Sequence, residues 1–176
     1  FVNDGYLVYE QYHALNNDFS MERYFIDEEK FNELKGFAVK EGDIIISCSG
    51  VYLGKLAIIP KNYKKGIINQ ALLKITLDNN FMNEILFTYI FTNNRFKEHY
   101  FGIQRGSGVP NFPPISEFKK FNFISPPITL QNQFAERIQA IEAQKQQAER
   151  SLQKSNDLFN SLLQRAFKGE LTQEHS

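Results

Sequence analysis

The sequence of 176 residues has one cysteine, no tryptophan and no long apolar run. A single cysteine excludes a disulfide framework and is typical of a reducing compartment, so we expect a cytoplasmic protein. No segment is long and apolar enough to cross a bilayer, and no signal peptide is recognisable, so we expect no membrane partner. These absences argue against secreted disulfide scaffolds and membrane-spanning proteins.

Sequence signatures of catalysis are also missing. The three histidines lie far apart and none neighbours Cys48, so no local pattern predicts a metal site or a Cys–His nucleophile. No glycine-rich cofactor loop or phosphate-binding loop follows a predicted strand. The segments at Asn111 and Ser125 match the adenine-methyltransferase motif only in part. The sequence therefore predicts no catalytic residue, no metal and no cofactor, and a self-contained methyltransferase or nuclease would need motifs that it lacks.

The charge is balanced in total but not along the chain. Residues 1–34 carry eight acidic side chains against two basic ones, whereas residues 40–74 carry six lysines against two acids. Residues 95–120 carry five basic side chains against two acids. A basic middle can face the phosphates of a nucleic acid, but it can also consist of lysines that solubilise loops.

The pattern of apolar residues predicts an α+β fold. We expect a mostly antiparallel, twisted sheet or partly closed barrel with short helices, followed by one long C-terminal helix that forms an antiparallel coiled coil with a partner helix. Asp27 is suited to cap a short helix. Expected strands cover residues 5–9, 44–48, 56–59, 67–75 and 121–124, and expected helices cover 27–34, 83–99 and 115–119.

The C-terminal segment carries a heptad pattern. From Phe134 to Ala166, one set of positions advances by four and three residues without a break. This spacing predicts a helix that pairs with another helix, and at roughly 38 residues it would be about 57 Å long. Thr129 is expected to cap the helix and Gly169 to follow its end. The predicted pairing residues, called the heptad face below, are Phe134, Ile138, Ile141, Leu152, Phe159 and Leu162.

Two polar loops contain residue types that contact DNA. A lysine-rich loop is suited to phosphates, and a glycine-containing loop combines Gln104, a type that pairs with adenine, with Arg105, a type that pairs with guanine. The predicted DNA-binding residues are Lys61, Lys64, Lys65, Asn69, Gln70, Gln104, Arg105, Ser107 and Asn111.

Several segments, in order, resemble the specificity (S) subunit of type I restriction–modification systems. They are 41–50, ending in Ser-Cys-Ser-Gly, then Leu-Gly-Lys at 53–55, Ile-Asn-Gln-Ala at 68–71, Gly-Ser-Gly-Val-Pro-Asn at 106–111 and 124–134. The end of the helix, 162–171, is similar to the end of the family's helical region. Order and spacing together make the resemblance specific, because none of these motifs is specific alone.

The resemblance implies a non-catalytic DNA-recognition subunit. Residues 1–128 would form a target-recognition domain that reads one half of a bipartite site in double-stranded DNA, residues 129–171 a spacer helix, and residues 172–176 a tail. Methyltransferase (M) and restriction (R) subunits would be its partners. Because one domain–helix unit is present and the family's usual opening is missing before Phe1, we expect either the clipped second half of a longer subunit or a half-length subunit.

Two expectations remain open at this stage. With no second helix in the chain, the isolated fragment is predicted to form a homodimer through its long helix. The main alternative is a coiled-coil interaction module that binds protein and not DNA.

Overall fold

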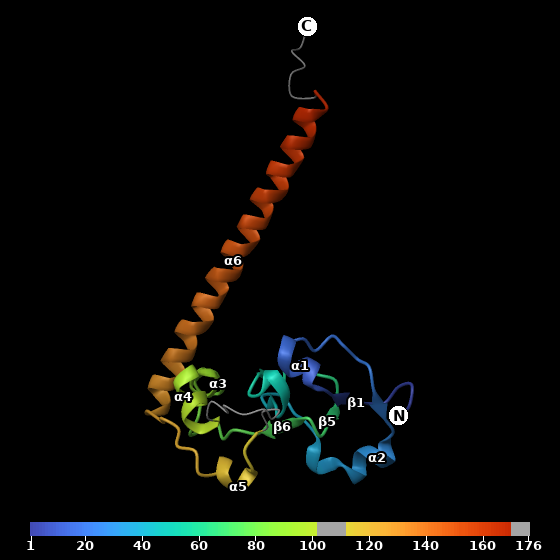
Figure 1. The fold of residues 1–176 in the computed structure, drawn as a ribbon, viewed down its shortest axis with the longest axis vertical. Helices are drawn as coiled ribbons and strands as arrows, with labels where there is room; N and C mark the ends of the chain where they lie inside the picture. Colours follow the sequence, from blue (N-terminus) through green and yellow to red (C-terminus); the bar gives the residue numbers. More distant parts are fainter. Residues whose placement is uncertain (102–111, 170–176) are drawn as a thin grey trace. The chain divides into compact units, whose positions relative to one another are not determined.

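The computed structural model describes residues 1–101 and 112–169, and it has the predicted α+β composition. The chain divides into two units, Phe1–Asn132 and Gln133–Ser176, which are described separately below. Small sheets and short helices make up the first unit, and helix α6 runs into the second (Figure 1). The described strands form two open sheets of three strands each and no closed barrel.

The first sheet has the strand order β2-β1-β5. Strand β1 (Tyr6–Tyr9) pairs antiparallel with β2 (Phe25–Ile26) and parallel with β5 (Gly66–Ile68). Gly66 lies opposite Leu7, and a Cβ at this position would overlap the backbone carbonyl of Leu7. The close approach of the two backbones therefore requires glycine at the start of β5. The strand at 5–9 was predicted, whereas the two-residue β2 was not.

The second sheet has the order β4-β3-β6, and both of its pairings are antiparallel. All residues of the central strand β3 (Ile44–Ser47) are buried, as its unbroken apolar run predicted. Its neighbours are β4 (Leu56–Ile58) and β6 (Leu72–Ile75). Asp43, directly before β3, is 1% exposed and accepts hydrogen bonds from Thr76 Oγ1 at 2.6 Å and the Lys40 N–H at 2.9 Å. Asp43 thus ties the beginning of β3 to the end of β6.

The prediction of one strand over 67–75 is wrong, because the chain leaves the first sheet after Ile68 and enters the second at Leu72. Asn69 makes the transition. Its N–H donates to the Tyr9 carbonyl at 3.0 Å, its side-chain Oδ1 accepts the Ala71 N–H at 3.1 Å, and its carbonyl accepts the Leu72 N–H at 3.2 Å. An asparagine whose side chain bonds the backbone two residues on is a turn former, and it interrupts the run.

The short helices match the predictions in part. Helix α2 (Glu28–Glu33) begins as expected, with Asp27 Oδ1 accepting the Lys30 N–H at 2.8 Å, and α5 (Ile115–Phe118) lies in its predicted place. Helix α1 (Gln11–Asn16) was not predicted. The chain also contains two short 3₁₀ helices in this region, η1 (Lys35–Phe37) and η2 (Gly50–Tyr52).

The expected single helix over 83–99 is two helices, α3 (Glu84–Thr92) and α4 (Asn94–Phe101). Asn93 between them has extended backbone angles, and its Oδ1 accepts the Arg95 N–H at 2.9 Å, as an N-cap residue does. The expected strand at 121–124 is also wrong. There the Tyr100 hydroxyl accepts the Asn122 N–H at 2.8 Å and donates to the Asn122 carbonyl at 3.2 Å. The backbone of Asn122 is therefore hydrogen-bonded to a side chain and not to a neighbouring strand.

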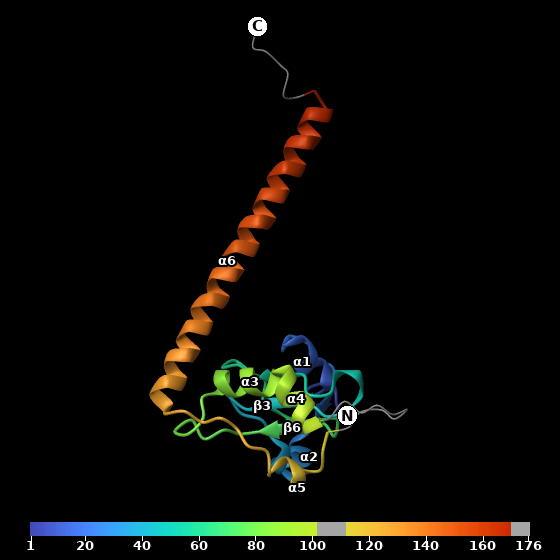
Figure 2. The same cartoon turned by 60° about the vertical axis from the view of Figure 1, so that its left-hand side comes forward.

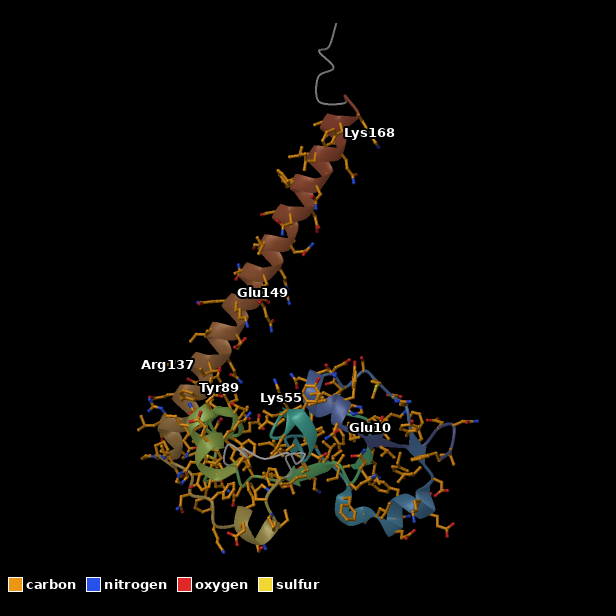
Figure 3. All side chains as sticks on the ribbon, in the orientation of Figure 1. Glu10, Lys55, Tyr89, Arg137, Glu149 and Lys168 are labelled. Atoms are coloured by element: carbon orange, nitrogen blue, oxygen red, sulfur yellow. The ribbon has the colours of Figure 1, made fainter. Side chains whose placement is uncertain are left out.

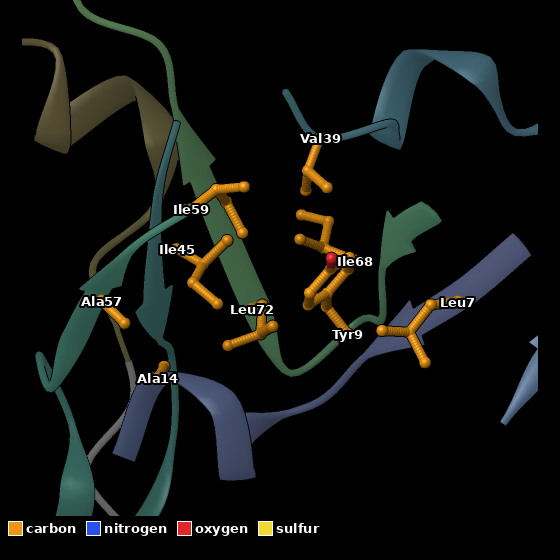
Figure 4. Packing of buried hydrophobic residues seen from close by; sticks show 9 residues of the cluster. All are labelled: Leu7, Tyr9, Ala14, Val39, Ile45, Ala57, Ile59, Ile68 and Leu72. Carbon is orange, nitrogen blue, oxygen red and sulfur yellow. The ribbon is translucent and has the colours of Figure 1, made fainter. Parts of the chain in front are cut away.

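Strand β3 separates two apolar clusters. Ile45 packs with Tyr9 and Leu72 in a cluster that joins the two sheets (Figure 4). Ile44 and Ile46 belong to a second cluster, called the phenylalanine cluster below, with Phe87, Phe91, Phe96, Phe101, Phe112, Phe118 and Phe123. Much of the chain's high phenylalanine content therefore fills one core around α3 and α4.

Helix α6 (Ile128–Phe167) is one unbroken helix of 40 residues, about 60 Å long at 1.5 Å per residue (Figure 2). It begins one residue earlier than Thr129, so the prediction of a Thr129 cap is wrong. The Pro127 carbonyl instead accepts the N–H groups of Leu130 and Gln131 at 2.9 and 3.2 Å. At the other end Gly169 has a φ of 75°, and its N–H bonds the Ala166 carbonyl at 3.0 Å, as predicted for the residue after the helix.

Candidate nucleic-acid interface

The lysine-rich loop between β4 and β5 is anchored on strand β1. The Tyr9 hydroxyl donates to the Lys64 carbonyl at 2.6 Å, and the Leu7 N–H donates to the Lys65 carbonyl at 3.0 Å. Burial raises the pKa of Tyr9, which keeps this hydroxyl protonated and able to donate. Strand β1 therefore holds the backbone from which the lysine side chains extend.

Lys64 is held by acidic residues of the first 34. Its Nζ lies 2.8 Å from Glu22 and 3.5 Å from Asp4, and 4.6 Å from the centre of the Phe25 ring. The hydrogen bond with Glu22 raises the pKa of Lys64. The acidic start of the chain thus neutralises part of its basic middle, and a phosphate would have to compete with two carboxylates for Lys64.

Lys61 and Lys65 differ from Lys64 in their exposure and in their ion pairing. Both are exposed, and in the described part of the chain neither forms an ion pair. The Lys65 ammonium lies over the rings of Tyr6 and Phe31, 5.1 and 5.0 Å from their centres. An ammonium over aromatic faces is attracted and positioned by them. Of the three lysines in this loop, Lys61 and Lys65 are the two without an ion pair in the described residues, and so the two better placed to bind an external anion.

Asn69 and Gln70 line a cavity of about 750 Å³ beside the first sheet. Asn69 uses its side-chain oxygen in the turn described above, whereas Gln70 is exposed. The other lining residues are mostly apolar: Phe1, Val8, Glu10, Tyr24, Ile26, Lys30, Leu34, Phe37, Ile67, Ile68 and Leu72. Of the two predicted contacts, Gln70 has the side chain that is not already engaged.

Gln104, Arg105, Ser107 and Asn111 lie outside the described residues, whereas Phe101 and Phe112 on either side of them are described. The rings of Phe101 and Phe112 are 5.4 Å apart between centres, and both contact Phe91. The Phe112 N–H also donates to the Cys48 carbonyl at 2.8 Å, at the end of β3. Both flanks of the segment 102–111 are thus anchored in the phenylalanine cluster.

Two further basic residues, Lys55 and Lys97, lie near each other and were not among the predicted contacts (Lys55 is labelled in Figure 3). Lys55 directly precedes β4, and Lys97 lies on α4. Burial, and then the nearby charge of Lys55, lower the pKa of Lys97. The only sequence signal for Lys55 was its place in the Leu-Gly-Lys motif, and its proximity to Lys97 depends on the tertiary fold.

The residues with catalytic potential have structural roles. His13 is fully buried, its Nδ1 accepting the Glu10 N–H at 2.9 Å and its Nε2 facing the Met21 carbonyl at 3.0 Å. Burial raises the pKa of Cys48 to about 11, so this thiol stays protonated near neutral pH. Within 1–101 and 112–169, no group of three or more His, Cys, Asp or Glu residues is placed to hold a metal. In the same ranges, no helix combines the length and apolarity needed to span a bilayer.

The heptad face of α6 is largely uncovered beyond its first two turns. Phe134 and Ile138 are half-buried, whereas Ile141, Leu152, Phe159 and Leu162 are 57%, 63%, 62% and 40% exposed. Side chains of both charges, among them Arg137 and Glu149, lie along the same helix (Figure 3). An amphipathic helix with this apolar row exposed has the surface that helix pairing requires.

The comparison with protein-family models matches residues 3–155 to the type I restriction modification DNA specificity domain. The chain belongs to this family. Comparison of the specificity domain with curated proteins finds no match. Among solved structures it is similar to a chain described under the words "complex assembly and conformational transition of the type I R-M system", with a TM-score of 0.54 and 17% identity.

That likeness covers 76% of the specificity domain and 34% of the solved chain, so the sequence spans about a third of that chain's length. At this identity the likeness supports the fold, while the family match supports DNA specificity. The family match confirms the resemblance found in the sequence.

Proposed function

We propose that residues 1–128 read one half of a bipartite site in double-stranded DNA, and that residues 129–171 form a spacer helix that pairs with a second helix and supports M subunits. The family match over residues 3–155 carries this proposal. The exposed heptad face of α6 and the basic loops of the first unit are consistent with it. In this proposal the chain recognises DNA and serves M and R subunits that carry the chemistry.

The proposed DNA contacts divide by residue type. Lys61 and Lys65 contact phosphates, because their charges are not matched by carboxylates in the described residues. Gln70, and the predicted Gln104, Arg105, Ser107 and Asn111, supply side chains for base edges or sugars. Lys64 and Asn69 remain in the proposed set, but each already has partners within the protein and contributes less.

Binding of the full chain to randomised duplex DNA tests the base contact. Arg105→Ala is expected to change sequence preference, costing about 1–3 kcal/mol at one base pair. Lys61→Gln is expected to weaken binding to all sequences alike and to reduce the salt slope by about 0.9. Lys154→Gln removes the same charge from α6 and serves as the control. Unchanged preference for Arg105→Ala would remove this residue from the interface.

Helix pairing is tested by the association state of the isolated chain. We propose a homodimer through α6, because Ile141, Leu152, Phe159 and Leu162 are exposed apolar residues at heptad spacing, which is the surface that helix pairing requires. Sedimentation equilibrium at micromolar concentration is expected to give a dimer for the native chain and a monomer for Leu152→Asp with Phe159→Asp. Gln153→Asp, on the same helix outside the heptad face, is the control. A monomeric native chain contradicts the pairing proposal.

Two alternatives give different outcomes in the same assays. A coiled-coil interaction module would dimerise but bind DNA without salt dependence or not at all. A self-contained methyltransferase would transfer label from S-adenosylmethionine to DNA without added M subunit. We expect dimerisation, salt-dependent DNA binding and no transfer.

A further inference from the structure

Lys55 and Lys97 are brought together by the packing of α4 against the segment before β4. A Cβ built on Gly54 would lie 3.6 Å from Lys97 Cε and 3.6 Å from Phe101 Cε2. The Lys97 stem therefore crosses the backbone immediately before Lys55.

The backbone that carries Lys55 is fixed on both sides. The Lys55 N–H donates to the Tyr52 carbonyl at 3.0 Å, and the Lys55 carbonyl accepts the Ser47 N–H at 2.8 Å from the end of β3. Lys97 is one helical turn before Phe101, which is anchored in the phenylalanine cluster. Both ammonium groups thus extend from rigid elements.

No ion pair among the described residues neutralises the charge of Lys55 or Lys97. Within residues 1–101 and 112–169, the ion pairs involve Lys30, Lys64, Lys74 and Lys120, and none of them involves Lys55 or Lys97. Lys55 is exposed and Lys97 is half-buried. Two like charges held near each other without a carboxylate repel, and an anion between them would relieve the repulsion.

We propose that Lys55 and Lys97 together hold one phosphate of the DNA backbone. The inference rests on the proposed DNA-reading function and adds a contact that neither the family match nor the sequence patterns assign. A phosphate oxygen accepts hydrogen bonds from both ammonium groups, and fixing one phosphate fixes the position of the duplex relative to α4 and β4. The pair acts on position and affinity and carries no base preference.

The salt dependence of DNA binding by the full chain tests the pair. Lys55→Gln combined with Lys97→Gln is expected to reduce the slope of log K against log salt by about 0.9, the value for one phosphate, with sequence preference unchanged. The matched control is Lys35→Gln combined with Lys154→Gln, which removes the same charge from other exposed positions. An unchanged slope in the first variant, with native binding intact, overturns the lysine pair alone. A native chain that binds no duplex overturns the proposed function as well.

A second measurement separates a phosphate contact from a structural role. The pKa of Lys97, followed by the ¹³Cε resonance in labelled native chain, is expected to rise when duplex DNA is added, because a phosphate favours the charged ammonium. A pKa that stays lowered in the complex contradicts the contact. An equal rise with sodium phosphate at the same ionic strength would assign the site to free phosphate and overturn the DNA assignment.

Discussion

Gln131 provides a sharp test of how the first turn of α6 is fixed to the domain that precedes it. The side chain is 1% exposed, and all its hydrogen-bonding groups are used. Its Oε1 accepts the Asn83 N–H at 2.8 Å, and its Nε2 donates to the carbonyls of Phe81 at 3.0 Å and Pro126 at 2.7 Å. Gln131→Ala removes these three bonds and leaves the Asn83 N–H and the Pro126 carbonyl without their side-chain partner, whereas the Phe81 carbonyl keeps the Ser125 hydroxyl at 3.3 Å.

The magnitude follows from the number of groups left without partners. A buried hydrogen bond contributes about 0.5–1.5 kcal/mol net, and an abandoned buried partner costs about 1–3 kcal/mol. Three hydrogen bonds are lost and two backbone groups lose their side-chain partner, so we expect about 3 kcal/mol for Gln131→Ala. Gln133→Ala, an exposed position on the same helix, is expected to change stability by less than about 0.5 kcal/mol.

Urea unfolding followed by tyrosine fluorescence is the appropriate assay, because all eight tyrosines lie between residues 6 and 100 and report on the first unit only. Gln131→Glu adds a pH test. Its carboxylate cannot donate to the two carbonyls, so folding raises its pKa. Part of the lost stability should therefore return as the pH falls through this raised pKa, and the return should be complete below the unfolded value of about 4.3. Equal midpoints for Gln131→Ala and Gln133→Ala would refute the reasoning.

Three further perturbations test other parts of the structure. Gly66→Ala should cost at least about 3 kcal/mol or prevent folding, because its Cβ overlaps the opposite backbone, whereas Gly36→Ala, with no atom in reach, should be neutral; thermal unfolding compares the two. Asp43→Ala should cost about 2–3 kcal/mol by urea unfolding because it removes the two hydrogen bonds that the buried Asp43 side chain accepts, with exposed Asp78→Ala as the milder comparison. Burial, and then a neighbouring carboxylate, raise the pKa of Glu84. The native chain should therefore lose stability relative to Glu84→Gln as the pH rises through and above 4.5. A constant difference in unfolding free energy between pH 3 and 7 would contradict this.

Local sequence patterns predicted those elements whose cause is local. The all-apolar run of β3, the Asp27 cap of α2 and the heptad spacing of α6 each determine an element within its own residues. Two predictions failed where an asparagine side chain redirected the backbone. Asn69 splits the expected strand over 67–75 between two sheets, and Asn93 divides the expected helix over 83–99.

The sequence predicted which residue types form the candidate interface, but not which of their charges are paired within the protein. The lysine-rich sequence predicted that the loop of Lys61, Lys64 and Lys65 contacts phosphates. Only the fold shows that Lys64 is paired with Glu22 and Asp4. Lys55 and Lys97 are distant in sequence, so no window along the chain could bring them together. Tertiary contacts decide which basic side chains keep an unmatched charge.

The contact between Phe101 and Phe112 has a consequence for how target preference could diverge. Phe101 and Phe112 contact each other and Phe91, so we expect this aromatic core to be retained when residues 102–111 are replaced. Under the proposed function, grafting a foreign stretch between these two rings would exchange target preference while retaining the same core.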